Sequence, residues 1–230
     1  MLKRRLLCSL AGALAAPALA RAQYREPAFS AGGRPIEITI ETLHPALVMS
    51  PGVFASHDRN HRLWQEGQKA SAGLKALAET GNTDPLMFET MLGIGKGFNS
   101  STIIYPILPR QRQIAVVTVT EAAPLISGAL MIGQTDDGFI GLESVDAHRL
   151  ALPHQLDLHA FDAGTKRNTE TKDSLVALGG SGGEPEDAPI RRHPGYGTSP
   201  DVQAEWRFDP SRPVARAILR AQPHQAHTAR

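Results

Sequence analysis

This chain of 230 residues has almost no cysteine and almost no net charge. It also has no long apolar run. Its one cysteine excludes a disulfide framework and a cysteine-rich zinc site. Lys and Arg number 24 against 23 Asp and Glu, so the net charge of +1 argues against a protein that binds nucleic-acid phosphates. The 41% of hydrophobic residues is too high for a disordered chain, and the 21 Gly and 17 Pro indicate many turns.

The first 22 residues have the order of a secretory signal peptide. Lys3, Arg4 and Arg5 form a basic start, residues 6–16 are apolar, and small residues suited to cleavage follow. The apolar run is shorter than the roughly 20 residues that cross a membrane, so we expect no transmembrane segment in the mature chain. The sequence therefore predicts export to the periplasm or out of the cell, and the arginine pair leaves both Sec and twin-arginine export open.

Cleavage after residue 22 changes the composition of the working protein. It removes four basic residues and no acidic residue, which lowers the net charge from +1 to −3. Cys8 is lost as well, so the 208 residues that remain of the 230 contain no thiol. We expect a mildly acidic domain that is held together by core packing.

The sequence pattern of the mature chain is typical of a single all-β domain. Residues 36–41 alternate strictly between isoleucine and polar residues, which predicts a half-buried strand. Short apolar runs rich in Val, Ile and Thr follow at 103–105, 113–121, 125–132, 139–142, 156–161 and 214–219. Gly, Pro and Asp clusters separate these runs, as in an antiparallel β-sandwich. We therefore expect a lead-in over 23–35, one domain over 36–220 and a flexible tail over 221–230.

One stretch has the period of a helix. Leu63, Gly67, Ala70, Leu74 and Leu77 are spaced by three or four residues and would share one helical face. The spacing predicts one main helical segment around residues 57–80. The glycine- and proline-rich stretch over 179–205 is expected to be a long loop instead.

The motifs typical of enzymes are incomplete in this chain. Gly97 follows Lys96 where a phosphate-binding loop needs Ser or Thr. His57 and His61 would share a helix face, but no third metal ligand is nearby in the sequence. Ser181 lies between glycines without the spacing of a nucleophile elbow. We predict that the protein is not an enzyme, although side chains far apart in the sequence could still form a site.

Aspartates gather in two predicted turns. Asp136 and Asp137 lie between two apolar runs, and Asp162 follows another. Turns at one end of a sandwich can bring carboxylates together around calcium, which takes six to eight oxygen ligands. Aspartates are also common in turns because they accept hydrogen bonds from their own backbone. The residues alone leave both explanations open.

Four segments resemble the N-terminal domain of spondins, in that family's order. Thr135–Asp146 resembles its S-P-D-W-F-V-G-[IV]-D-S-L-D segment, and Leu156–Thr165 resembles its L-D-L-Y-P-Y-D-A-G-T-D segment. The stretch His57–Gly81 contains the G-x-x-A-S-x-G-L pattern, and Pro213–Arg216 is similar to the closing P-[IV]-A-R strand. The resemblance extends over residues 36–219, and stand-alone bacterial members of the family are the most similar in organisation.

The resemblance implies an antiparallel β-sandwich related to C2 domains, with the helical segment packed against it. It also implies a calcium-binding adhesion domain. Two of the family's ligating aspartates fall on Asp137 and Asp162, whereas the third falls on Lys166, and Gly138 stands where the family has Trp. A lysine cannot ligate a cation.

Three arrangements could compensate for Lys166. Asp136 or Asp146 could supply the missing carboxylate, Asn168 could supply a carbonyl oxygen, or Lys166 could pair with Asp162 in place of the ion. We expect an exported, non-catalytic binding or adhesion module, with calcium as its cofactor and an extracellular or envelope protein or glycan as its partner. The alternatives are a periplasmic enzyme with an unrecognised site, and a structural envelope protein without a small ligand.

Overall fold

The computed structural model describes residues 33–147, 151–180, 182–196 and 199–222. The predicted signal peptide and most of the lead-in and tail lie outside these residues. Within them no helix is both long enough and apolar enough to cross a membrane. The strands are β1 (Arg34–Thr42), β2 (Met49–His57), β3 (Phe98–Ile104), β4 (Arg112–Val119), β5 (Leu125–Ile132), β6 (Gly138–Asp146), β7 (His154–Leu158), β8 (Phe161–Asp162), β9 (Arg191–Arg192) and β10 (Ala215–Ala221). The helices are α1 (Ala72–Thr80), α2 (Asp84–Leu92) and the short 3-10 turns η1 (Val176–Leu178) and η2 (Ala204–Trp206).

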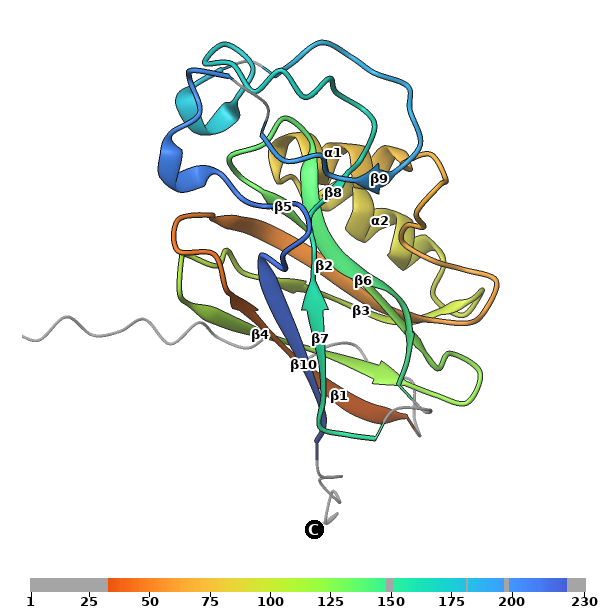
Figure 1. The fold of residues 1–230 in the computed structure, drawn as a ribbon. Coiled ribbons are helices and arrows are strands. Elements are labelled where there is room, and N and C mark those ends of the chain that lie inside the picture. Colours follow the sequence, from red (N-terminus) through yellow and green to blue (C-terminus); the bar gives the residue numbers. More distant parts are fainter. Residues whose placement is uncertain (1–32, 148–150, 181, 197–198, 223–230) are drawn as a thin grey trace, which may run out of the picture.

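The described strands form two antiparallel sheets that face each other (Figure 1). One sheet has the order β4-β1-β10-β7, and the other has the order β3-β2-β5-β6-β8-β9. The predicted antiparallel sandwich is therefore confirmed, and every predicted run contributes to a strand. The segment between β8 and β10 forms a group of loops at one end of the sandwich (Figure 1).

The main core lies between the two sheets. The three isoleucines of β1 at positions 36, 38 and 40 are fully buried and face inward, as their alternation predicts. Phe54 of β2, Leu130 of β5 and Ile140 of β6 pack in the same cluster from the opposite sheet. Each such side chain contributes roughly 1.5–3 kcal/mol when it leaves water, so this interface supplies most of the driving force for folding.

A second core covers the outer face of the six-stranded sheet. Leu74 and Leu77 of α1 and Leu86 of α2 pack there with Trp64 and Phe139. Strand β5 is consequently buried on both faces along its whole length. This double coverage explains why its sequence reads as a continuous apolar run rather than as an alternation.

The predicted helix over 57–80 is wrong in its first half. His57 is the last residue of β2, where it pairs with both Leu125 and Phe98, and the chain is irregular from there to residue 71. Trp64 docks onto the six-stranded sheet instead, and its indole Nε1–H donates to the Gly128 carbonyl at 2.9 Å. Gly67 has a φ of 82°, which ends any helical path.

The true helix α1 begins and ends at recognisable caps. The Ser71 hydroxyl accepts the Leu74 N–H at 3.1 Å, and Gly81 adopts a left-handed conformation with a φ of 71°. Helix α2 was not predicted. It presents three exposed apolar side chains to solvent, so its sequence lacks the one-sided pattern that identifies a surface helix.

Candidate functional site

The candidate site is built around the turn between β5 and β6. The pairing of β6 with β8 places this turn beside Asp162. Asp136 and Asp137 lie between β5 and β6, and Gly138 at the start of β6 pairs with Asp162 of β8. The Thr135 hydroxyl accepts the Gly138 N–H at 2.8 Å and so closes the turn. A Cβ atom at Gly138 would lie 2.5 Å from that hydroxyl oxygen, so a larger residue would fit here only if Thr135 shifted.

Asp137 anchors the loop that follows β8. Its Oδ2 accepts the backbone N–H groups of Thr165 at 2.7 Å and Lys166 at 2.9 Å, and the Thr165 hydroxyl lies at 3.2 Å. Its Oδ1 is buried and has no hydrogen-bond partner. Burial, followed by the nearby charge of Asp162, raises the pKa of the Asp137 carboxyl to about 6. The charged form of this carboxyl group is therefore less favourable than that of an exposed aspartate.

Asp162 is fully buried and has donors on both oxygens. Its Oδ1 accepts the Gly164 N–H at 2.6 Å, and its Oδ2 accepts the Asn168 side-chain amide at 2.6 Å. The same Oδ2 accepts Nε of Arg191 at 3.0 Å and lies 2.9 Å from Nη2. A guanidinium group therefore neutralises Asp162.

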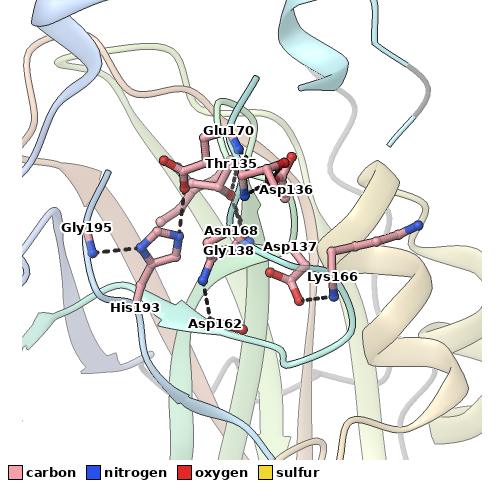
Figure 2. A network of polar contacts seen from close by, with 12 residues as sticks. Thr135, Asp136, Asp137, Gly138, Asp162, Lys166, Asn168, Glu170, His193 and Gly195 are labelled. Atoms are coloured by element: carbon pink, nitrogen blue, oxygen red, sulfur yellow. Dashed lines mark hydrogen bonds and ion pairs between the residues drawn. The ribbon is translucent and has the colours of Figure 1, made fainter. Parts of the chain in front are cut away.

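Asp136 binds the next part of the same loop. Its Oδ2 accepts the backbone N–H groups of Thr169 at 2.9 Å and Glu170 at 2.8 Å, whereas its buried Oδ1 has no partner. Figure 2 shows these aspartates with the loop residues that they bind. Together the three carboxylates hold residues 164–170 against the end of the six-stranded sheet.

A buried acid and a histidine extend this network. His193 Nε2 lies 3.3 Å from Oε1 of Glu170, and both side chains are almost completely inaccessible to solvent. His193 Nδ1 accepts the Gly195 N–H at 3.1 Å, so the imidazole proton is on Nε2 and faces the carboxyl group (Figure 2). Burial raises the pKa of Glu170. The pair is a buried part of the same network, because the Glu170 N–H binds Asp136.

The family model described as Spondin_N matches residues 44–175, which is more than half of the chain. The chain belongs to the Spondin_N family. Human Spondin-2 is 30% identical over 118 residues, which cover 48% of this chain and 35% of that relative. The chain thus spans about a third of the curated relative that it matches, and membership indicates a binding or adhesion type of module.

The predicted site residues of this Spondin_N domain divide into two groups. Asp136, Asp137 and Asp162 lie together at the loop end, whereas Asp146 lies at the far end of β6, about 30 Å along the strand. Asp146 pairs there with Arg59 at 2.8 Å. The structure therefore does not place Asp146 where it could replace the missing ligand.

Lys166 does not pair with Asp162. Its backbone N–H binds Asp137, and its Nζ donates to the Gly183 carbonyl at 2.9 Å. The cation beside Asp162 is Arg191, which lies beyond the family match and outside every segment that carried the resemblance. Sequence reasoning also missed Glu170 and His193, because no local pattern marks loop residues that meet only in the tertiary structure.

His57 and His61 do not share a helix face, because His57 ends strand β2 and His61 lies in the irregular segment after it. His57 Nε2 lies 2.7 Å from the Ser127 hydroxyl and its Nδ1 lies 2.7 Å from the Asp58 carbonyl, while His61 binds the Asp58 carboxylate at 2.8 Å. His57 was expected at a helix start, but it is a buried strand residue.

The oxygen atoms of the loop cluster are of the type that a hard cation prefers. Asp136 Oδ1, Asp137 Oδ1 and Asn168 Oδ1 are buried and accept no hydrogen bond. In the part of the chain that the structure describes, no three His, Cys, Asp or Glu side chains converge closely enough to hold a metal ion. A cation at Asp137 and Asp162 would therefore need the Asn168 carbonyl, main-chain oxygens or water as well.

Proposed function

We propose that this Spondin_N domain is an exported, non-catalytic module that binds an extracellular or envelope protein or glycan through its loop end. The support is architectural. Buried carboxylates hold residues 164–170 at the end of a two-sheet scaffold with two apolar cores. Loops on a rigid scaffold commonly carry recognition, because their side chains vary without cost to the core.

We further propose that Asp137 and Asp162 hold calcium, with Asn168 in place of the family's third acid. The observation that carries this proposal is the buried Oδ1 of Asp137, which has neither a donor nor access to water. Calcium takes six to eight oxygens at about 2.3–2.6 Å, and water and main-chain carbonyls would complete the set. The ion would supply a positive charge next to Asp137 Oδ1, which accepts no hydrogen bond.

Calorimetry with calcium chloride tests the calcium site. The chain freed of metal by EDTA should release or take up heat on titration, and millimolar calcium should raise its melting temperature. Asp137→Asn should abolish both effects, since it removes the charge and keeps the size. Asp146→Asn is the matched control and should bind as the wild type does. Binding that survives in Asp137→Asn, or no binding by the wild type, would contradict the site.

The proposal that the domain is non-catalytic is supported by the positions of two histidine–carboxylate pairs, neither of which lines the open hollow. His61 and Asp58 are on a surface loop, and His193 and Glu170 are closed off in the interior. An open hollow of about 400 Å³ is lined by Glu41, Arg110, Gln111 and Arg112, without a nucleophile or histidine. The proposal would be overturned if the wild type turned over an ester, phosphate or peptide substrate and His61→Ala did not.

Immobilised chain can be used to find the partner. Envelope extract and a glycan array should each be applied with calcium and again with EDTA. Retention of one protein or glycan that is released by EDTA supports a calcium-dependent binding module. Retention that is unaffected by EDTA supports binding and contradicts its dependence on calcium.

A further inference from the structure

Arg191 is the positively charged residue that contacts the buried carboxylate of Asp162. Strand β9 pairs with β8 so that Arg191 lies directly opposite Asp162 in the register. Two guanidinium nitrogens lie at 3.0 and 2.9 Å from the same carboxylate oxygen. The carboxylate is fully buried, whereas the arginine side chain is 41% exposed. The position of the guanidinium is thus set by strand pairing, and its side chain retains a path to solvent.

Arg191 also has a second partner outside the cluster. Its Nη2 lies 2.9 Å from Oε2 of Glu186, which is partly exposed. If the guanidinium left Asp162, it would remain paired with Glu186. The guanidinium therefore bridges the two carboxylates, and Glu186 could retain it if it moved away from Asp162.

From this geometry we infer that Arg191 is an internal cation that competes with calcium for Asp162 and so sets the calcium concentration at which the loop end binds. The inference rests on the proposed calcium site. A cation that coordinates Asp162 would lie within a few ångströms of the guanidinium, and two positive charges at that distance repel each other strongly. Arg191 must therefore withdraw to Glu186 before the ion can bind, and that withdrawal weakens binding.

Removal of the arginine charge tests the competition. Arg191→Met should bind calcium roughly tenfold or more tightly than the wild type in calorimetry, because binding no longer displaces a competing charge. Arg192→Met is the matched control, since it removes the same charge from the next residue. Arg192 lies 4.5 Å over the Phe161 ring, and its variant should bind as the wild type does.

A variant with the opposite expected effect excludes a general loss of structure as the explanation. Glu186→Gln removes the outer partner of Arg191 and should weaken calcium binding, while its melting temperature in EDTA shows that it is folded. Glu184→Gln is its control, because Glu184 pairs with Arg167 at 3.5 Å and not with Arg191. It removes the same charge nearby and should have the affinity of the wild type.

The outcomes separate this inference from the calcium proposal. If Arg191→Met binds calcium and the wild type does not, the competition is supported and calcium binding by the natural chain is contradicted. If both bind with equal affinity, the calcium site stands and the competition is overturned. If neither binds, both are overturned, because removal of the arginine has then exposed no cation site.

Discussion

Asp137 has two unlike oxygen atoms, and each suggests a different role. Oδ2 accepts three hydrogen bonds from Thr165 and Lys166, whereas the buried Oδ1 accepts none. The first oxygen serves the fold and the second is available for a cation. The two roles can be separated by the choice of substitution, because asparagine retains one acceptor oxygen and alanine retains none.

The first prediction is that Asp137→Ala lowers the free energy of unfolding by about 3 kcal/mol in EDTA, because buried N–H donors of the loop lose their acceptor. Asp137→Asn should lower it by about 1 kcal/mol or less. Urea unfolding of both variants and the wild type measures the difference. Equal losses in the two variants would mean that the hydrogen bonds to Oδ2 do not hold the loop.

His57 gives a prediction about pH. Its imidazole is fully buried, and burial lowers its pKa in the folded state despite the hydrogen bond to the Asp58 carbonyl. The unfolded chain, with a pKa near 6.5, therefore binds a proton at a pH where the folded chain does not. This contribution to stability is complete above about pH 6.5 and is lost as the pH falls below that value.

The expected result is a smaller pH dependence in His57→Gln, which retains a polar side chain but cannot titrate. Between pH 7.5 and 5.5 the variant should lose less stability than the wild type, because only the wild type takes up the His57 proton on unfolding. Urea unfolding at both pH values, with EDTA present, gives the two differences. If the two proteins lose the same amount, the protonation of His57 is not coupled to unfolding.

At the scale of elements, the two helices are joined by one carboxylate. Glu89 of α2 accepts the Gly73 N–H at 2.6 Å and the Ser71 hydroxyl at 2.7 Å. Both donors belong to the first turn of α1, where free N–H groups and the helix dipole favour a negative charge. Glu89 thus caps α1 from outside and fixes the position of α2 against it.

Glu89→Ala should therefore lower the free energy of unfolding by about 2 kcal/mol, since it leaves the Gly73 N–H and the Ser71 hydroxyl without their acceptor. Glu121→Ala removes the same charge from an exposed turn and should change stability by less than about 0.5 kcal/mol. Thermal and urea unfolding provide the comparison. A loss in Glu89→Ala no larger than in the control would show that the cap adds nothing.

At the scale of the whole molecule, the family match is shorter than the folding unit. Strands β1 and β10 lie outside the matched residues 44–175, yet they are the two central strands of the four-stranded sheet. Removal of both would leave β4 and β7 without a neighbour and would expose the inner face of the opposite sheet. The apolar contribution that is lost, about 1.5–3 kcal/mol for each buried isoleucine of β1, is comparable to the whole stability of a domain.

A fragment of residues 44–175 should therefore not fold, whereas a fragment of residues 33–222 should. Circular dichroism and urea unfolding distinguish them, because only the longer fragment should have a cooperative transition. A cooperative transition in the shorter fragment would show that the six-stranded sheet and its helices are stable without the second sheet.

Local patterns were sufficient for most of the fold. The alternation in β1 and the apolar runs of β4, β5 and β6 are readable because burial on one or both faces of a sheet acts on neighbouring residues. The helix prediction failed over residues 57–71 because contacts with residues far away in the sequence determine the structure there. Leu63 and Gly67 have a helical spacing to later residues, but the contact of neighbouring Trp64 with Gly128 is a tertiary one that the spacing cannot reveal.

By itself, the sequence determined the sandwich and the presence of aspartates at its turns, since periodicity and turn chemistry are properties of short segments. Only the tertiary structure decided which charges meet. The pairing of β6 with β8 and of β8 with β9 brings Asp137, Asp162 and Arg191 together across more than fifty residues, and it leaves Asp146 at the other end of the same strand. Strand register is set by the packing of both cores at once, so neither the partner of Asp162 nor the role of Lys166 could be read from residues near them in the chain.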